Sequence, residues 1–250
     1  YLTLVGCGIC GGEVNEALPA ALSIELLHNF TLLHDDIMDR ADTRRGEPSV
    51  FKKWNSNTAI LSGDAMYAKA FKQLQYYGHS NLYSKSQYST ILDIFLNSAE
   101  TVCEGQAYDL MFENQTDVRI EEYIQMIEGK TAALISGALA IGAAVAKTDE
   151  TTIDELRFVG KKAGIAFQIQ DDLLDAIADP QKFGKKRGGD IIEGKKTYLT
   201  LLALERCNNN QQNKLQKILA NNSSTGDVNT VIRMYQDLNI IEDTKNAVQY

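Results

Sequence analysis

Long helical periodicities constrain the fold of this chain more than any other feature of its sequence. Apolar residues recur at three-to-four spacing over long stretches, and only three prolines interrupt the chain. This spacing predicts helices at 20–39, 60–77, 88–111, 120–146, 153–178 and 198–207. Two shorter, polar helices are expected to follow, divided by the cap and turn residues of "NNSSTGD". The sequence therefore predicts an all-α protein.

Size and charge exclude several classes of protein. The 250 residues, 44% of them hydrophobic, can bury one large core, so a single domain is expected. The net charge of −8 argues against nucleic acid as a partner, because a phosphate polymer needs a basic face. The apolar stretch 132–146 is shorter than the roughly 20 residues of a spanning helix. We therefore expect no membrane span and, in the absence of a leader pattern, a cytoplasmic protein.

The first twelve residues, "YLTLVGCGICGG", allow two interpretations. Gly6, Gly8 and Gly11 have the spacing of a dinucleotide-binding loop that follows a strand, with Asp35 or Asp36 at a suitable distance. Such a fold must alternate strands with helices, whereas the later segments are helical. Glycines that let helices approach closely are the interpretation that we favour.

The cysteines give little sign of a metal or redox site. Cys7 and Cys10 form a C-x-x-C, but no second pair and only three histidines accompany it, as a zinc site would require. We expect all four cysteines, which include Cys103 and Cys207, to be small core residues.

Two aspartate triplets carry the strongest chemical signal. In "LLHDDIMDRADTRR", Asp35 and Asp39 share one helix face, whereas Asp36 points to an adjacent sector. The same spacing returns in "AFQIQDDLLDAIADP" as Asp171, Asp172 and Asp175. One such cluster fits a solvated helix end, but two of them after apolar turns require cations. Oxygen ligands in this number suit Mg²⁺, which keeps waters and is completed by substrate phosphates.

Basic residues near both triplets favour a diphosphate as the missing ligand. Arg44 and Arg45 follow the first triplet, and arginine forks and lysines are the usual partners of phosphate oxygens. The second triplet is followed by a glycine-rich stretch with further basic residues, namely Lys185, Lys186, Arg187 and Lys195. Lys130 and Thr131 in "EGKTAALI" add a further cation, although a Walker loop would need glycine where Ile124 stands.

As a set, these motifs resemble those of the trans-isoprenyl diphosphate synthases, or polyprenyl synthetases. The motifs are "DDIMDRADTRRGEP", "GKT", "FQIQDDLLD" and "GKKRGGDIIEGKKT", in the family's order and over nearly the whole chain. The resemblance implies an orthogonal helical bundle around a central cavity, with the two aspartate clusters facing each other at its mouth. It also implies a short-chain enzyme similar to farnesyl and geranylgeranyl diphosphate synthases, and a homodimer.

The chemistry that the resemblance implies is a metal-assisted prenyl transfer. About three Mg²⁺ ions hold the allylic diphosphate and draw it away as a leaving group, which produces an allylic carbocation. The double bond of isopentenyl diphosphate then attacks this cation, and a proton is lost. An apolar cavity protects the cation from water.

The resemblance also assigns roles to individual residues. Its metal ligands are Asp35, Asp36 and Asp39 in the first motif and Asp171, Asp172 and Asp175 in the second. The allylic diphosphate would be held by Arg44, Lys130 and Lys185, and isopentenyl diphosphate by Arg45 and His28. Gln168 and Thr131 would stabilise the cation, and Lys195 would lie near the departing pyrophosphate. For His28, a core side chain is the alternative.

Product length and chain boundaries are two further expectations. In related enzymes, a bulky aromatic residue five residues before the first aspartate lies below the growing tail and limits elongation. Phe30 has this position before Asp35, with the small Thr31 beside it, so the resemblance implies a fifteen- or twenty-carbon product, although Phe30 could equally be a core residue. Family members also carry a Gly-Lys-Arg type segment upstream of the point at which "YLTLVG" begins. Either the chain lacks its true N-terminal segment or the protein lacks half of this substrate site, and we favour the first.

Two other functions share part of the pattern. Class I terpene cyclases have the helical cavity and the first motif, but their second motif normally mixes Asn or Asp with Ser or Thr and Glu. A noncatalytic partner subunit would tend to lose an aspartate cluster, and both clusters are intact here. The sequence therefore favours a prenyltransferase.

Overall fold

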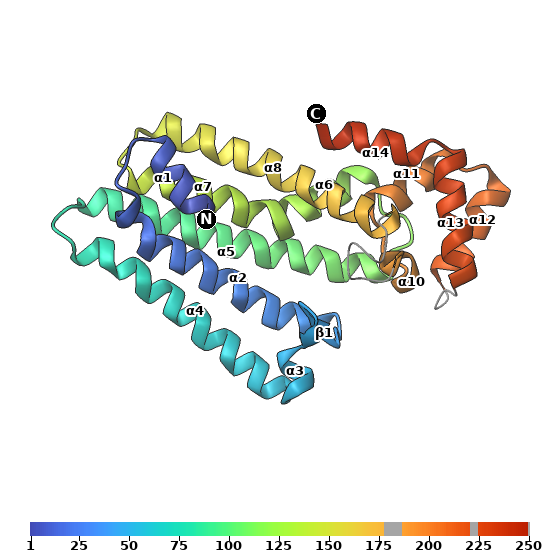
Figure 1. Cartoon of the computed structure of the whole chain (residues 1–250), viewed down its shortest axis with the longest axis horizontal. Helices are drawn as coiled ribbons and strands as arrows, with labels where there is room; N and C mark the ends of the chain where they lie inside the picture. Colours follow the sequence, from blue (N-terminus) through green and yellow to red (C-terminus); the bar gives the residue numbers. More distant parts are fainter. Residues whose placement is uncertain (178–186, 221–224, 250) are drawn as a thin grey trace. The chain divides into compact units, whose positions relative to one another are not determined.

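The computed structural model describes residues 1–177, 187–220 and 225–249, which are predominantly helical (Figure 1). Within these ranges the only strands are β1 (Thr43–Arg44) and β2 (Glu47–Pro48), a short antiparallel hairpin. The all-α prediction is confirmed. The chain divides into two compact units: unit 1 is Tyr1–Thr101 with Ala133–Lys161, and unit 2 is Val102–Ala132 with Lys162–Tyr250.

Unit 1 contains two of the predicted helices whole and parts of three others, and it begins with a short helix. Its elements are α1 (Leu2–Ile9), the 3₁₀ turn η1 (Val14–Ala17), α2 (Leu18–Met38), α3 (Val50–Lys53), α4 (Ser56–His79), the start of α5 (Lys85–Asn114), α7 (Ala133–Val145) and the start of α8 (Glu150–Ile177). Pro19 lies in the first turn of α2, where its missing N–H costs nothing. The Asn55 side chain caps α4 by accepting a hydrogen bond from the Thr58 N–H at 2.8 Å.

Hydrogen bonds between buried groups fix α2 against α4, which lies beside it in Figure 1. The Ser23 hydroxyl donates to the Ala70 carbonyl at 2.8 Å. The Tyr77 hydroxyl donates to the Glu16 carbonyl at 2.7 Å and accepts from the Ala20 N–H at 3.2 Å. Fully buried side chains around them include Leu27, Leu74, Phe95 and Ile141. These contacts anchor η1 and the N-terminal half of the helix that carries the first aspartate triplet.

The N-terminal glycines serve helix packing. A Cβ atom on Gly6 would lie 2.5 Å from the carbonyl oxygen of Leu139, and one on Gly142 would lie 2.2 Å from that of Thr3. Glycine at these positions therefore lets α1 and α7 approach closely. Because Leu2–Ile9 is a helix, the dinucleotide-loop interpretation is excluded.

The cysteine prediction is only partly right. All four thiols are free, and Cys7 is fully buried in the unit 1 core. Cys103 is exposed on α5, so the expectation of a core residue is wrong there. A small side chain is tolerated on an outward helix face as well as in a core, so the spacing of the cysteines did not distinguish the buried Cys7 from the exposed Cys103.

The apolar stretch after Lys130 is a buried core helix, as predicted. In α7, ten of thirteen residues are buried. Within the described ranges, one helical stretch, Ile120–Val145, is long and apolar enough to cross a membrane, but most of it is buried inside the structure. That degree of burial is typical of a core helix in a soluble protein. The predicted single helix 120–146 is divided into α6 (Ile120–Ile127), the π-helical turn η2 (Glu128–Ala132) and α7.

Unit 2 contains the ends of α5 and α8 and the C-terminal helices. Its further elements are α6, η2, α10 (Gly189–Glu193), α11 (Tyr198–Arg206), α12 (Asn209–Leu219), α13 (Thr225–Asp237) and α14 (Ile240–Gln249). Its fully buried side chains include Leu173, Leu199, Leu215, Tyr235 and Ile240. The predicted polar helices correspond to α12 and α13, whereas α14 was not predicted. Most of the "NNSSTGD" turn lies outside the described residues.

Candidate active site

The first aspartate triplet lies at the end of α2. Asp35 and Asp36 belong to its last turn, and Asp39 is its C-cap residue. Asp35 and Asp39 are partly exposed, but Asp36 is only 3% exposed. The helix spacing predicted that Asp36 would point to a different sector, and its burial agrees with that prediction.

A hairpin returns two arginines toward this triplet. Arg45 and Gly46 form the turn between β1 and β2 with φ angles of 54° and 82°, which is the left-handed pair of a type I′ turn. The Arg44 guanidinium then donates to Oδ1 of Asp36 from Nε at 2.9 Å and from Nη2 at 2.5 Å. Its Nη2 also lies 3.5 Å from Oδ2 of Asp35.

This ion pair stabilises the charged form of the arginine, which is a cation in any case. Burial lowers the pKa of Arg44, but the hydrogen bond and charge of Asp36, together with the other carboxylates of the triplet, raise it overall. Arg44 is therefore a permanent cation held beside the cluster. The carboxylate of Asp36 is occupied by this arginine, which leaves Asp35 and Asp39 as the better candidates for a metal.

His28 lies on α2 two turns before the triplet. Burial lowers its pKa, and the charge of Glu25 partly opposes that effect. The positive charges of Arg45 and Arg44 lower it further. His28 is therefore a neutral side chain at neutral pH, able to donate one hydrogen bond and accept another.

The residues predicted to limit product length lie on the same helix. The ring of Phe30 meets the His34 ring at 4.7 Å and the Tyr67 ring at 5.2 Å between centroids. Tyr67 in turn stacks on the buried Phe95 at 6.3 Å. Thr31 donates its hydroxyl to the His28 carbonyl at 2.8 Å, which satisfies it within the helix. Phe30 thus lies at one end of the row Phe30–Tyr67–Phe95, with the His34 ring on its other side.

The second aspartate triplet lies near the end of α8, in unit 2. Asp171 is exposed, Asp172 is 6% exposed and Asp175 is partly buried. The Asp175 carboxylate accepts the backbone N–H groups of Gly189 at 3.2 Å and of Asp190 at 3.1 Å. It therefore ties the first turn of α10 to α8.

Asp172 is held by three donors. Its Oδ2 accepts from the Tyr123 hydroxyl at 2.5 Å and from the Tyr198 N–H at 3.1 Å, and its Oδ1 accepts from Nε2 of Gln168 at 3.1 Å. Burial raises the pKa of Asp172 to about 6, although the hydrogen bonds act in the opposite direction. Burial also raises the pKa of Tyr123 well above its ordinary value, so the phenol remains a donor.

The Lys-Thr motif lies in the π-helical turn η2, a feature often found at functional sites. Lys130 Nζ lies 2.5 Å from the carboxylate of Asp109 on α5, and the Thr131 hydroxyl donates to Oε1 of Gln168 at 2.8 Å. Thr131 and Gln168, predicted to act together, are therefore in contact. Asp109 and Tyr123 were not predicted as site residues, because each lies far in sequence from the residue that it contacts. For Asp109, the available signal was an acidic residue within an apolar helix.

The glycine-rich segment after α8 is described only in part. Lys185 and Lys186 lie outside the described residues. Lys195 is paired with Glu193 at 3.0 Å and is half exposed. Burial raises the pKa of Asp190 to about 7, the charges of Asp175 and Asp172 raise it too, and Lys195 opposes them. Asp190 is an acidic residue that the sequence analysis quoted without assigning a role.

The donor set fits a metal that is completed by substrate. Over the ranges that the structure describes, no group of three or more His, Cys, Asp or Glu side chains could enclose a metal ion by itself. Mg²⁺ keeps waters and takes one or two carboxylates with phosphate oxygens, so it needs no closed set of protein ligands. The partly exposed Asp35 and Asp39, and the exposed Asp171, suit the Mg²⁺ arrangement.

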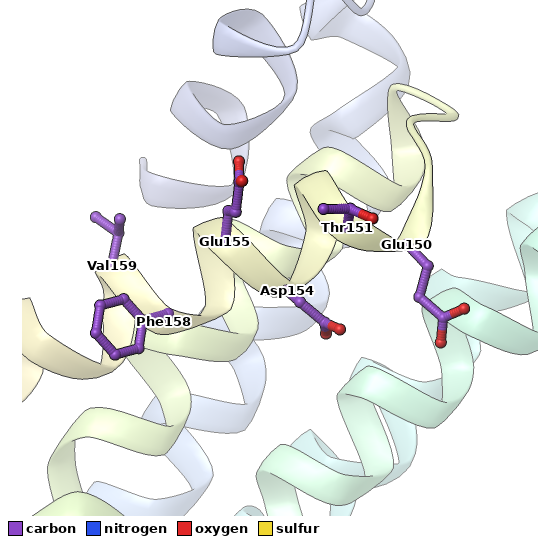
Figure 2. Close-up of a pocket in the computed structure, with 6 residues that line it drawn as sticks. All are labelled: Glu150, Thr151, Asp154, Glu155, Phe158 and Val159. Carbon is purple, nitrogen blue, oxygen red and sulfur yellow. The ribbon is translucent and has the colours of Figure 1, made fainter.

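The pocket drawn in Figure 2 lies elsewhere. Its lining residues follow the first turns of α8 in unit 1 and are Glu150, Thr151, Asp154, Glu155, Phe158 and Val159. None of them belongs to the predicted site.

Comparisons with known proteins place these motifs in a family. The polyprenyl synthetase family model matches residues 1–236. The short chain isoprenyl diphosphate synthase of Methanocaldococcus jannaschii is 42% identical over 221 residues, which cover 88% of this chain and 66% of that protein. The geranylgeranyl diphosphate synthase of Saccharolobus solfataricus is 44% identical over 213 residues, which cover 85% and 64%. This chain thus spans slightly less than two thirds of the length of these curated relatives.

Solved structures agree in fold. A geranylgeranyl pyrophosphate synthase superposes with a TM-score of 0.92 at 40% identity, covering 99% of this chain and 76% of the other. The geranylgeranyl pyrophosphate synthase from Corynebacterium glutamicum, solved with isoprenyl diphosphate and magnesium, has a TM-score of 0.84 at 29% identity, covering 95% and 71%. With a family model over most of its length and relatives above 40% identity, the chain belongs to the polyprenyl synthetase family.

Proposed function

We propose that this protein is a metal-dependent trans-prenyltransferase that condenses isopentenyl diphosphate with an allylic diphosphate and releases a fifteen- or twenty-carbon prenyl diphosphate. The names of its relatives support this assignment, since they include short-chain isoprenyl and geranylgeranyl diphosphate synthases. Family membership alone does not set a reaction, so the residues of the two clusters must carry the chemistry.

The observation that carries the proposal is the combination of carboxylates and cations at the end of α2. Arg44 is held as a cation beside the first triplet by a buried carboxylate, and the charges of both hairpin arginines act on His28. We assign Arg44 to the allylic diphosphate, and Arg45 and His28 to isopentenyl diphosphate. Asp35 and Asp39 would hold divalent ions, of which about three are expected with the diphosphate.

Residues of unit 2 are assigned the remaining roles. Asp171 would contribute a further metal contact, whereas the hydrogen bonds of Asp172 and Asp175 support a structural role for those two carboxylates. Lys130 and the glycine-rich segment with Lys185 would bind the allylic diphosphate, and Lys195 the departing pyrophosphate. The oxygen atoms of Thr131 and Gln168 would stabilise positive charge on the allylic carbon.

The mechanism follows from where charge develops. When bound, Mg²⁺ neutralises negative charge on the diphosphate as the carbon–oxygen bond breaks. Arg44, Lys130 and Lys195 act on the same developing charge, so they lower the barrier more than they strengthen ground-state binding. The oxygen lone pairs of Thr131 and Gln168 stabilise the cation until the double bond of isopentenyl diphosphate attacks it. An apolar surrounding keeps water away from that cation.

Product length would be set below the allylic carbon by Phe30. The support is its position at the end of the row formed with Tyr67 and Phe95. Replacing it in Phe30→Ala should release longer products if this ring closes the cavity. An unchanged product spectrum would remove Phe30 from the proposal without touching the reaction itself.

We further propose that the whole chain acts as one polyprenyl synthetase domain, as a cytoplasmic homodimer whose only substrates are small prenyl diphosphates. Burial of the most apolar helical stretch and the net charge of −8 support an enzyme without a membrane span or a nucleic-acid partner. The molar mass in solution, measured by light scattering, tests the dimer.

A condensation assay tests the reaction. The protein is incubated with Mg²⁺, isopentenyl diphosphate and dimethylallyl, geranyl or farnesyl diphosphate in turn, and the products are identified by mass spectrometry. Elongation to fifteen or twenty carbons supports the proposal. Cyclic hydrocarbons would indicate a terpene cyclase, and folded protein that turns over no primer would indicate a partner subunit.

A further inference from the structure

A continuous hydrogen-bonded chain joins Tyr123 on α6 to Thr131 in η2 by way of α8. Tyr123 donates to Asp172 at 2.5 Å, Gln168 donates to the other oxygen of Asp172 at 3.1 Å, and Thr131 donates to Gln168 at 2.8 Å. All four residues belong to unit 2. Tyr123 is 2% exposed and Asp172 is 6% exposed, so water has little access to the inner end of the chain.

Hydrogen-bonding capacity fixes the direction of every link. An ionised aspartate accepts only, so Gln168 must turn its NH₂ group to Asp172 and its carbonyl oxygen to Thr131. The Thr131 hydroxyl has one hydrogen, and the Gln168 oxygen takes it. The atoms left over on the outer pair are oxygen lone pairs. The carboxylate of Asp172 therefore leaves oxygen lone pairs, and not N–H or O–H hydrogens, as the unused groups of Thr131 and Gln168.

We infer that Tyr123 is a positioning residue for the prenyl transfer: through Asp172 it fixes the orientation of the Gln168 amide and, with it, the Thr131 hydroxyl. The inference rests on the proposed function, because it concerns the two side chains assigned there to the allylic cation. If Gln168 turned over, its NH₂ hydrogens would replace the oxygen lone pairs beside a developing positive charge. Asp172 then acts as the acceptor that forbids this rotamer, and not as a metal ligand.

The geometry of Asp172 supports a positioning role over a purely structural one. Tyr198 supplies a backbone N–H to the same oxygen as Tyr123, at 3.1 Å, so the carboxylate is held from two sides before Gln168 binds it. Gln168 lies one turn before Asp172 on α8, whereas Thr131 lies in the π-helical turn. The chain therefore sets the mutual placement of side chains from two different elements.

The test uses a matched pair of Tyr→Phe variants. Tyr123→Phe removes the hydroxyl that holds Asp172. Tyr235→Phe removes another buried hydroxyl of unit 2, which shares a hydrogen bond with Thr200 at 2.9 Å outside this chain of residues. We expect Tyr123→Phe to lower kcat by about tenfold or more, with KM for isopentenyl diphosphate unchanged. Tyr235→Phe should lose similar stability but keep its kcat.

A double-mutant cycle shows whether Tyr123 acts through Gln168. In a Gln168→Leu background, Tyr123→Phe should lower kcat by less than twofold further, because the oriented amide is already gone. Additive losses would overturn the inference, as would equal kcat values for the two tyrosine variants. If Tyr123→Phe does not fold, Asp172→Asn asks the same question, since its amide can turn a donor toward Gln168.

Calorimetry separates this inference from the proposed function. Binding of inorganic pyrophosphate in the presence of Mg²⁺ should change by less than twofold in Tyr123→Phe, since the diphosphate and metal contacts are intact. A tenfold loss of binding would place Asp172 among the metal ligands and overturn the inference. Absence of turnover in the unsubstituted protein would instead refute the proposed function.

Discussion

The two aspartate triplets have the same spacing but satisfy their middle carboxylate in opposite ways. On α2, the buried Asp36 is paired with the charged guanidinium of Arg44. On α8, the buried Asp172 is paired with a phenol, an amide and a backbone N–H, which are all neutral. The two triplets therefore have the same sequence spacing but different electrostatic environments. The middle carboxylate is paired with a cation in the first triplet and with neutral hydrogen-bond donors in the second.

The comparison also separates roles within each triplet. The middle residue is the most buried member in both clusters, because position i+1 lies in a different sector from i and i+4. The account assigns metal contact to the more accessible Asp35, Asp39 and Asp171, and the fixing of neighbouring groups to Asp36 and Asp172. Each assignment can be broken by substitution.

The largest expected effect is the loss of turnover when the outer residues of the first triplet are removed. Asp35→Ala and Asp39→Ala should each lower kcat by about a thousandfold, since metal stabilisation of the leaving group supplies several kcal/mol. Helical content by circular dichroism should stay nearly unchanged, because neither residue is fully buried. Loss of the fold in these variants would show that the residues serve packing.

A smaller effect concerns pH and the neutral environment of Asp172. Its pKa in the folded protein is raised to about 6 from an ordinary 3.8. The folded state therefore holds the proton more tightly, so the stabilisation is complete below about pH 4 and is lost as pH rises through 6. In metal-free buffer, the free energy of unfolding should fall in that window relative to Asp172→Asn, by roughly 3 kcal/mol at most.

Urea denaturation at pH 4, 5, 6 and 7 measures that difference. Asp172→Asn serves as the reference protein, because asparagine keeps the shape of the side chain but does not titrate. Parallel stability profiles for the two proteins would contradict a buried carboxylate held only by neutral donors.

The smallest expected effect is a difference in salt dependence. The Arg44 side chain is 38% exposed, so its attraction to Asp36 is partly screened. The destabilisation caused by Asp36→Asn should therefore shrink by a few tenths of a kcal/mol between 0.05 and 1 M NaCl. That of Asp172→Asn should not shrink, because the hydrogen-bond partners of Asp172 are neutral and its charged neighbour Asp171 repels it instead of attracting it. Equal salt dependence in the two variants would remove the distinction between the clusters.

Much of the fold could be predicted because it depends on local periodicity. The sequence predicted the bounds of α2, α4, α5 and α8 to within a few residues, because a long amphipathic pattern indicates where a helix begins and ends. The π-helical turn at Glu128–Ala132 could not be predicted, because it continues the apolar pattern and differs only in its backbone hydrogen bonds. The hairpin of β1 and β2 is too short to show an alternating pattern.

The candidate site was predictable in its residue types and not in its contacts. Both triplets, the arginines and the Lys-Thr motif were named from spacing and chemistry. The partners Asp109 and Tyr123 lie 21 and 49 residues from Lys130 and Asp172, so only the fold brings them together. The different helix sector of the middle aspartate agrees with its burial, but the sequence did not indicate which residues donate hydrogen bonds to Asp36 and Asp172.

The most direct test compares two adjacent residues under one identical change. Binding of pyrophosphate with Mg²⁺ is measured by calorimetry for the unsubstituted protein, Asp171→Asn and Asp172→Asn. The account predicts at least about tenfold weaker binding for Asp171→Asn, as expected for a lost metal contact, and less than twofold for Asp172→Asn. Equal weakening in both variants, or a larger loss in Asp172→Asn, would contradict the division of roles within the triplets.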